Sequence, residues 1–390
     1  MRPASPESPR KVCVVVASRA NYGRIKSTLQ AIRAHPCLEL QLVVSASALL
    51  YRFGSAIDVI RADGFEPDRC LHIIVEGENP TTMAKSTGLA VMEMATAFEN
   101  LKPDLVLTVA DRFETLATAI AASYMNIPVA HTQGGEVTGS IDESVRHAIT
   151  KLSHVHFPST ERSRERLLRL GEDPRQVYLT GCPAMDLLVP IAEEPSRPDL
   201  LKRYGGVGRE IELSKPYLVV LQHPVTTEYG SGFEQINETL RAVHEIDLQA
   251  VWFWPNVDAG SDDVSKGIRT FRERVPDNRI HFYLNMSPED YARLILRSAC
   301  LVGNSSSALR EGAFLGVPAV NVGSRQDGRE RGENVVDADY DSAEIAAAIA
   351  EQLDRGRYPP SGLFGDGHAG ERIADALAQC DPPLQKRITY

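Results

Sequence analysis

Short apolar runs alternate with longer amphipathic stretches along most of the chain. In the first half, the apolar runs predict strands at residues 12–17, 40–44, 71–75, 105–109, 128–131, 154–157 and 177–179. The amphipathic stretches between them predict helices at 22–32, 81–99, 112–124, 141–152 and 160–170. Continuous apolar strands that are each followed by a helix are typical of a parallel sheet covered on both faces.

The same alternation restarts after a polar, proline-bearing stretch at 190–204. Strands are predicted at 217–221, 250–254, 280–284, 300–302 and 318–322, and helices at 234–245, 264–274, 288–298, 308–315 and 342–353. We therefore expect two doubly wound α/β units with a ligand cleft where the carboxyl ends of their strands meet. The expected order is a disordered leader (1–10), an N-terminal Rossmann-like domain (11–190), a linker (191–215), a C-terminal Rossmann-like domain (216–370) and a closing helix and tail (371–390).

Composition excludes several classes of function. The 42 Lys+Arg and 52 Asp+Glu give a net charge of −10, which argues against binding nucleic acid or anionic membranes through bulk charge. No apolar stretch reaches the roughly 18–20 residues of a membrane helix, and the polar N-terminus is unlike a signal peptide. The six cysteines contain no C-x-x-C pair, so neither a zinc site nor a disulfide framework is predicted. We expect a cytoplasmic protein that acts on a small molecule.

The segment after the first predicted strand has the character of an anion-binding turn. Arg19 and the N–H groups of a helix start suit a diphosphate, although a simple helix cap is the structural alternative. The segment lacks the glycines of a dinucleotide fingerprint. Asp111 and Arg112 end another apolar strand, where they either face the cleft or hold the loop as a mutual ion pair.

The densest polar cluster follows the strand at 128–131. A Gly-Gly pair at 134–135 lets the backbone approach a ligand closely. On the next predicted helix, acidic and basic residues stand at i,i+4 spacing, which surface ion pairing alone would also explain. Taken together, the position and the glycines favour a site. Its candidate residues are His131, Gln133, Glu136, Asp142, Glu143, Arg146 and His147.

Polar residues also follow the predicted strands of the second half. His223 and Asn256 end neighbouring strands, and Ser305, Ser306 and Ser307 open a helix. Serines cap helices, but three in a row with unpaired N–H groups also suit a phosphate. Glu311 could bridge ribose hydroxyls, and Arg325 could add positive charge. His154 and His156 alternate on a strand and point in opposite directions, so no metal site is predicted.

Taken in order, these motifs resemble the hydrolysing UDP-N-acetylglucosamine 2-epimerases of the sialic and legionaminic acid pathway type, including UDP-N,N'-diacetylbacillosamine 2-epimerases. The resemblance runs from about residue 11 to about residue 334. It rests on Arg19-Ala20-Asn21-Tyr22, Asp111-Arg112-Phe113-Glu114, His131 with Gly134-Gly135-Glu136, Ile141-Asp142-Glu143 with Arg146-His147, His223-Pro224, Pro255-Asn256, Gly303-Asn304-Ser305-Ser306 with Arg310-Glu311, and Gly323 with Arg325-Gln326.

The resemblance implies a glycosyltransferase-B-like fold in which the C-terminal domain binds the nucleotide. It implies loss of the C2 proton with departure of UDP to give a glycal, then hydration to the free manno-configured sugar, with no cofactor and no metal. A homo-oligomer, dimer or tetramer, is expected. Substrate binding is assigned to Arg19, Asn21, Arg112, His223, Asn256, Ser305, Ser306, Glu311 and Arg325. Proton chemistry is assigned to Asp111, Glu136, Asp142, Gln133, Glu143 and His147.

Two positions depart from the family pattern. A carboxylate is common where this chain has Gln133, and an acidic residue is common where it has Asn21. We therefore expect either UDP-N-acetylglucosamine or a 2,4-diacetamido-2,4,6-trideoxy relative as the substrate. A non-hydrolysing 2-epimerase, a glycosyltransferase of the same architecture and a non-catalytic nucleotide-sugar sensor are the alternatives.

Overall fold

The apolar runs of the first half form one sheet. In the computed structural model, which describes residues 4–256 and 258–389, its strand order is β3-β2-β1-β4-β5-β6. Every pairing within this described sheet is parallel. The strands are β1 (Arg10–Val16), β2 (Leu38–Ser45), β3 (Arg69–Leu71), β4 (Leu105–Val109), β5 (Val129–Thr132) and β6 (Val155–Phe157).

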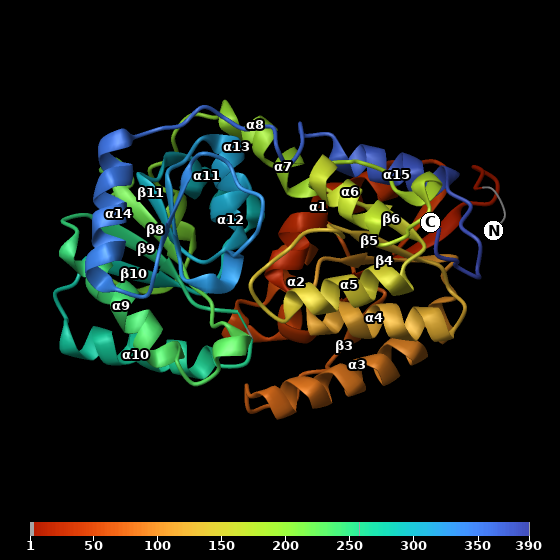
Figure 1. Cartoon of the computed structure of the whole chain (residues 1–390), viewed down its shortest axis with the longest axis horizontal. Helices are drawn as coiled ribbons and strands as arrows, with labels where there is room; N and C mark the ends of the chain where they lie inside the picture. The colour runs from red at the N-terminus through yellow and green to blue at the C-terminus, as the bar shows by residue number, and fades with distance from the viewer. Residues whose placement is uncertain (1–3, 257, 390) are drawn as a thin grey trace.

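Helices cover both faces of this sheet (Figure 1). Successive side chains of a strand point to opposite faces, and those of β1 enter two different cores. Val12 and Val14 face the core under α1 (Arg19–Ala34) and α15 (Ala369–Gln379), whereas Cys13 and Val15 face the core under α3 (Pro80–Leu101) and α4 (Phe113–Tyr124). The helices of this half are α1 (Arg19–Ala34), α2 (Ala56–Ala62), α3 (Pro80–Leu101), α4 (Phe113–Tyr124), α5 (Asp142–Leu152), α6 (Glu161–Arg169), α7 (Pro183–Asp186) and α8 (Leu188–Ala192).

The second half forms a sheet of order β13-β12-β11-β8-β9-β10-β7, which is parallel except that β7 runs antiparallel to β10. Its strands are β7 (Gly206–Gly208), β8 (Tyr217–Leu221), β9 (Gln249–Phe253), β10 (Ile280–Tyr283), β11 (Cys300–Gly303), β12 (Ala319–Val322) and β13 (Val335–Ala338). Its helices are α9 (Gly232–Glu245), α10 (Ser261–Arg274), α11 (Pro288–Arg297), α12 (Ser306–Leu309), α13 (Glu311–Leu315) and α14 (Ser342–Arg355).

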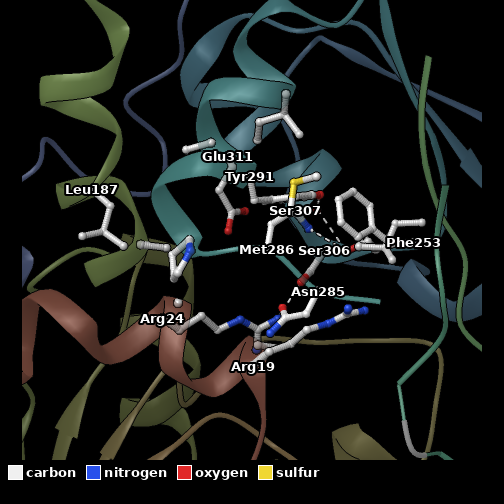
Figure 2. Close-up of a pocket in the computed structure, with 18 of the residues that line it drawn as sticks. Arg19, Arg24, Leu187, Phe253, Asn285, Met286, Tyr291, Ser306, Ser307 and Glu311 are labelled. Atoms are coloured by element: carbon white, nitrogen blue, oxygen red, sulfur yellow. Dashed lines mark hydrogen bonds between the residues drawn. The ribbon is translucent and has the colours of Figure 1, made fainter. Parts of the chain in front are cut away.

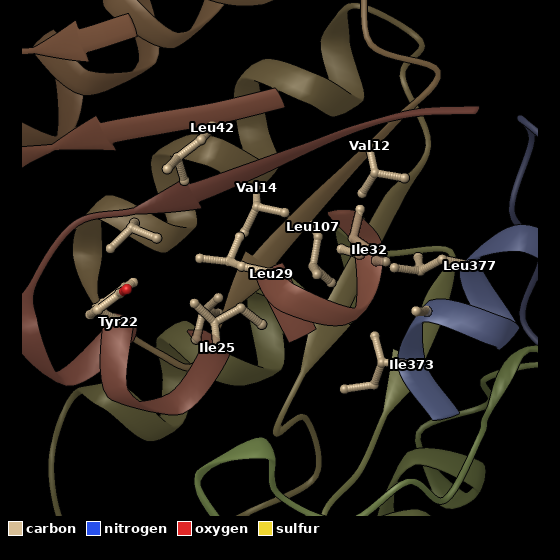
Figure 3. Close-up of a cluster of buried hydrophobic side chains, with 14 of the residues drawn as sticks. Val12, Val14, Tyr22, Ile25, Leu29, Ile32, Leu42, Leu107, Ile373 and Leu377 are labelled. Carbon is tan, nitrogen blue, oxygen red and sulfur yellow. The ribbon is translucent and has the colours of Figure 1, made fainter. Parts of the chain in front are cut away.

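The chain returns to the first unit at its end. Helix α15 (Ala369–Gln379) packs Ile373 and Leu377 against the apolar face of α1, where Leu29 and Ile32 lie (Figure 3). Residue Arg10, within the expected leader, is already in β1 and donates to the Cys380 carbonyl at 2.9 Å. Residues 1–3 of that leader lie outside the described residues.

The expected linker at 191–215 contributes to the second unit. Strand β7 lies within it and pairs with β10, and Leu200 and Leu201 are buried in the core of that unit. Strand β7 carries a single apolar side chain between two glycines, so no hydrophobic period could predict it. Helix α2 and strand β13 were also not predicted.

Three predicted elements differ in detail from those found. The strand predicted at 177–179 is wrong: Val177 forms one isolated bridge with His156, and Leu179 is exposed. The strand predicted at 71–75 is β3, which ends at Leu71. The helix predicted at 308–315 is interrupted at Arg310, whose backbone separates α12 from α13 and whose side chain is buried. Across the described residues, no helix is long and apolar enough to span a membrane.

Candidate active site

A cavity of about 130 Å³ lies between the two units. The N-terminal residues of α1 form one wall, and residues around the start of α12 form the opposite wall (Figure 2). Apolar side chains, among them Phe253 and Met286, also line it. Of the residues nominated from the sequence, those that line the cavity are Arg19, His223, Asn256, Ser305, Ser306 and Glu311.

Two arginines of α1 bring positive charge to this cavity. Arg19 donates to the carbonyl oxygens of Trp254, at 2.9 Å, and Leu284, and Arg24 donates to the hydroxyl of Ser306 at 2.6 Å. Among the described residues, neither arginine forms an ion pair with a carboxylate. Burial lowers the pKa of Arg19 to about 10 and also lowers the pKa of Arg24, to which Arg310 contributes. Buried cations without a protein anion favour an anionic ligand.

The serines at 305–307 form the opposite wall. Ser305 caps the short helix α12, because its hydroxyl oxygen accepts from the Ser307 N–H at 3.3 Å. The Ser307 hydroxyl in turn lies 2.7 Å from the Tyr291 hydroxyl. The capping role considered for these serines is therefore present, while Ser306 turns its hydroxyl to Arg24 across the cleft.

His223 is held as a neutral side chain. Asn304 brackets its backbone: the Asn304 Oδ1 accepts from the His223 N–H at 2.7 Å, and its Nδ2 donates to the His223 carbonyl at 2.9 Å. The Asn256 N–H donates to the imidazole Nδ1 at 3.2 Å. Burial lowers the pKa of His223 well below its usual value, and Arg325 and Arg19 lower it further. The neutral ring therefore carries its proton on Nε2, where it can donate to a ligand.

Glu311 provides a carboxylate to the cavity. Its Oε2 is buried and has no hydrogen-bond partner among the described residues. A buried carboxylate oxygen without a donor is costly, so this atom suits a ligand that carries hydroxyl groups.

Two of the nominated acids are locked in ion pairs with arginines. Arg146 donates to Asp111, and both Arg310 and Arg329 donate to Glu136, Arg329 at 2.6 Å. Burial alone would raise the pKa of both carboxyls. The arginines outweigh it: Asp111 is held well below its usual pKa, and the pKa of Glu136 is lowered to about 2. Both carboxylates stay ionised at neutral pH.

Asp142 is tuned in the opposite direction. It stands at the start of α5, and its Oδ2 lies 3.9 Å from an Arg325 nitrogen. Burial, followed by the charge of Asp111, raises the pKa of Asp142 to about 6, although Arg325 opposes the shift. Of the acids nominated for proton chemistry, this one has a pKa suited to exchanging a proton near neutral pH.

Gln133 lies where the two units meet. Its side-chain oxygen accepts from Arg310 at 3.2 Å and from Arg24 at 3.5 Å, and its nitrogen donates to the Cys182 sulfur at 3.4 Å. The left-handed backbone of Gln133, with φ of 62°, turns the chain as it leaves β5. The amide therefore lies between two guanidinium groups without neutralising either.

Other nominated residues lie around the cavity rather than in its lining. Arg112 pairs with Glu114 and, at 2.8 Å across the two units, with Asp258. The side chain of Asn21 is buried and accepts from the Ala17 N–H at 3.2 Å, which ties α1 to the end of β1. Arg325 donates to the Asn304 carbonyl at 3.2 Å.

Glu143 and His147 form the expected i,i+4 pair, at 3.5 Å, with side chains about one third exposed. Glu143 also accepts from the Thr138 N–H at 2.8 Å, so it orders the loop before α5. The described cavity lining includes neither residue. No cluster of three or more His, Cys, Asp or Glu side chains in the described ranges is arranged to hold a metal ion.

Sequence reasoning gave no role to several residues of the site. Arg146 was a candidate without an assigned role, Arg310 occurs in a quoted motif, and Arg24 was not singled out; the main partners of all three come from other segments of the chain. The proximity of Arg24 to Arg19 on one helix was the available signal. No signal in the sequence pointed to Arg329, because its partner Glu136 lies in the other unit. Asn304 was quoted without its link to His223.

The chain matches the family described as UDP-N-acetylglucosamine 2-epimerase over residues 30–378. It is 34% identical to a hydrolysing UDP-N,N'-diacetylbacillosamine 2-epimerase of Legionella pneumophila, over 97% of this chain and 98% of that protein. It is 32% identical to the polysialic acid biosynthesis protein P7 of Escherichia coli, over 87% and 85%.

The fold is similar to that of the UDP-GlcNAc 2-epimerase of Neisseria meningitidis bound to UDP-GlcNAc, with a TM-score of 0.78 at 20% identity over 94% of this chain and 99% of that one. The enzyme of Methanocaldococcus jannaschii gives 0.76 at 17% identity, with the same coverage. The expected glycosyltransferase-B-like class is thereby confirmed. With its motifs, its cleft and these likenesses, the chain belongs to the UDP-N-acetylglucosamine 2-epimerase family.

Proposed function

We propose that this chain is a hydrolysing UDP-sugar 2-epimerase, which converts its substrate to UDP and the free manno-configured sugar. Asp142 is the observation that carries the proposal, because its pKa of about 6 suits proton exchange. It lies outside the described lining of the cavity, but its Oδ2 is 3.9 Å from Arg325, which donates to the carbonyl of Asn304, the neighbour of Ser305 in the cavity wall. A carboxylate near its pKa can remove a weakly acidic proton while nearby cations stabilise a departing diphosphate. The relatives at 30–34% identity include hydrolysing enzymes and support the same reaction.

The cavity residues divide the nucleotide among them. Arg19 and Arg24 bind the diphosphate from the N-terminal unit, and Ser305 and Ser306 bind it from the C-terminal unit. His223 donates a hydrogen bond from its Nε2–H as a neutral group. Arg325, whose charge acts on His223, adds positive charge to the same part of the site. Glu311 accepts hydrogen bonds from the ribose hydroxyls through its unpartnered oxygen. The apolar part of the cavity takes the base.

The reaction then has two steps. Asp142 takes the proton from C2, the C1–O bond breaks, and its electron pair leaves with the β-phosphate, so that a C1–C2 double bond forms. Water next adds as hydroxyl to C1 and releases its second proton. A solvent proton adds to C2 on the face opposite to Asp142, and Asp142 gives the proton that it removed back to solvent. Asp111 and Glu136 stay ionised: Asp111 raises the pKa of Asp142, and Glu136 holds Arg310 and Arg329 in place. No proton exchange is assigned to Gln133, Glu143 or His147.

The substrate that we favour is the UDP-linked 2,4-diacetamido-2,4,6-trideoxy sugar, with UDP-N-acetylglucosamine as the second candidate. The Legionella and Campylobacter relatives carry names of this kind, at 34% and 30% identity. Gln133 and Asn21 depart from the family pattern and support a branch with its own sugar. A cytoplasmic location and a homo-oligomer, dimer or tetramer, complete the proposal.

Proton NMR in D2O with each UDP-sugar tests the proposal. Free manno-configured sugar with deuterium at C2 and an equal amount of UDP is the expected result, with faster turnover of the diacetamido substrate. Equal or reversed preference would remove the assignment of the sugar. A UDP-linked epimer would instead identify a non-hydrolysing enzyme, which is the second candidate; relatives at 26–27% identity are named UDP-N-acetylglucosamine 2-epimerase without the word hydrolysing. Binding without turnover would identify a sensor, and turnover only with an acceptor a glycosyltransferase.

A further inference from the structure

His131 is a buried histidine to which the proposed reaction gives no part. It lies on β5, is fully buried, and places its Nε2 2.7 Å from the carbonyl oxygen of Ala110, which follows the neighbouring strand β4. A carbonyl oxygen only accepts, so Nε2 must carry the proton. Burial lowers the pKa of His131 to about 3, against the hydrogen bond to Ala110, which raises it. The imidazole is therefore a neutral donor of fixed tautomer at physiological pH.

The acceptor of this hydrogen bond has an unusual backbone. Ala110 has φ of 66°, in the left-handed region where a Cβ crowds the following carbonyl oxygen. A non-glycine residue persists there where its surroundings hold it. The left-handed residue turns the chain between the last residue of β4 and Asp111, so its conformation sets the direction in which the Asp111 side chain leaves the sheet.

We propose that His131 is a positioning residue: its hydrogen bond to the Ala110 carbonyl holds the left-handed turn that directs Asp111 to Arg146 and Asp142. This rests on the proposed function, since it concerns the acids assigned there. The hydrogen bond joins the carboxyl ends of two adjacent strands, and the chemistry lies at that edge of the sheet. An apolar residue would fill the same space in the core but would leave the strained turn without its donor.

Loss of the His131 hydrogen bond would affect the reaction by changing the charges that surround Asp142, and with them the pKa of Asp142. These are Asp111 beyond β4, Arg112 at the start of α4, Asp258 in the loop after β9 and Arg325 after β12. Asp111 raises the pKa of Asp142, whereas Arg325 and Arg112 lower it. When Asp111 moves away, the pKa of Asp142 falls, and its ionisation shifts to lower pH.

A double-mutant cycle separates this role from general packing. His131→Phe is expected to lower kcat about 100-fold, because a displacement of the catalytic groups by about 1 Å costs a factor of that order. It should also move the acidic limb of the pH profile of kcat to lower pH. His131→Gln places an amide donor near the Nε2 position and should restore at least a tenth of the activity. Ala110→Gly removes the strain, because glycine adopts positive φ freely. In the Ala110→Gly background, the fold-loss in kcat caused by His131→Phe should be at least fivefold smaller than in the wild-type background.

The matched control is His156→Gln, on the next strand of the same sheet. His156 is equally buried but contacts Glu172 rather than Ala110, so its variant should lower Tm and leave the pH limb in place. If His131→Phe lowers kcat equally in both backgrounds without moving the limb, the residue only packs the core and the proposal fails.

A second measurement does not depend on turnover. Nitrogen-15 spectra of histidine-labelled protein should show His131 as the Nε2–H tautomer at neutral pH, and the Nδ1–H tautomer would overturn the proposal. If the wild-type chain hydrolyses no UDP-sugar, the proposed function fails, whereas the tautomer and the coupling of the two substitutions in thermal unfolding still test the hydrogen bond.

Discussion

Arg24 of the N-terminal unit donates a hydrogen bond of 2.6 Å to Ser306 of the C-terminal unit, and the bond crosses the cleft at the wall assigned to the diphosphate (Figure 2). Helix α1 contributes Arg24, and the first turn of α12 contributes Ser306. In the described residues this guanidinium has hydroxyl and amide partners but no carboxylate. The protein therefore leaves this buried cation without an ion-pair partner where the two units meet.

Replacing Arg24 by Met should weaken the binding of UDP about 10- to 100-fold, because a hydrogen bond to a charged group contributes about 1.5–3 kcal/mol. Titration calorimetry with UDP measures the change directly. Arg33→Met is the matched control, because this arginine lies on the same helix but donates to the Gly64 carbonyl away from the cavity. Equal affinity in the Arg24 and Arg33 variants would remove Arg24 from the diphosphate site.

Asp142 predicts the pH dependence of the reaction. Its carboxyl must lose a proton before it can accept one from C2, so kcat should rise with pH through an apparent pKa of about 6. Asp142→Asn should abolish turnover and retain UDP binding. A wild-type profile that is flat between about pH 5 and pH 8 would contradict the assignment.

The same shift predicts an effect on stability. Because the folded pKa of Asp142 lies above its ordinary value of 3.8, ionisation of this carboxyl costs folding free energy as pH rises from about 4 to about 6. Asp142→Asn should therefore raise Tm at pH 7 and leave Tm nearly unchanged below about pH 4. Calorimetric scans at both pH values provide the test, and a lower Tm at pH 7 would show that the carboxylate is stabilising.

Gln133→Glu tests two different predictions for a carboxylate at this position, one from the family pattern and one from the geometry of this chain. The family pattern would make a carboxylate at this position an acid/base group. Here it would lie between Arg310 and Arg24, which would hold its pKa low and keep it ionised. We expect UDP to bind about tenfold more weakly, because the new carboxylate neutralises Arg24, with no gain in kcat. Gln133→Leu, which removes the amide without adding charge, is the control; faster turnover by the Glu variant would refute this account.

The C-terminal tail should contribute to stability. Lys386 donates to the carbonyl oxygens of Thr150 and Ser153 at the end of α5, each at 2.7 Å, and pairs with the buried carboxylate of Glu172. Lys386→Met should lower the free energy of unfolding by about 1.5–3 kcal/mol, since it removes hydrogen bonds made by a charged group. Denaturant unfolding measures this loss. The exposed neighbour Arg387 provides the control substitution, which is expected to leave the midpoint unchanged.

The sequence by itself determined most of the helices and strands, the fold class and the family. A strand buried on both faces of a parallel sheet is mostly apolar, so runs such as 105–109 and 217–221 coincide with β4 and β8. The polar residues after those strands lie at the cleft for the same reason, because the carboxyl ends of parallel strands share one edge. Arg19, His223, Ser306 and Glu311 could thus be nominated from position alone.

The tertiary structure decided which nominated groups face each other, and hence their charge states. The sequence gives no reason to expect different pKa values for Asp111, Glu136 and Asp142. In the structure, arginines from other segments lower the pKa values of Asp111 and Glu136, whereas burial and the charge of Asp111 raise that of Asp142. Arg329 and Glu136 are 193 residues apart, and no local period encodes their contact. The return of α15 to α1 likewise depends on an apolar surface that exists only once the first unit has folded. The helices and strands follow from the periodicity of apolar residues along the chain. The pKa values of the site depend on distances between charged groups, and only the packing of the folded chain sets those distances.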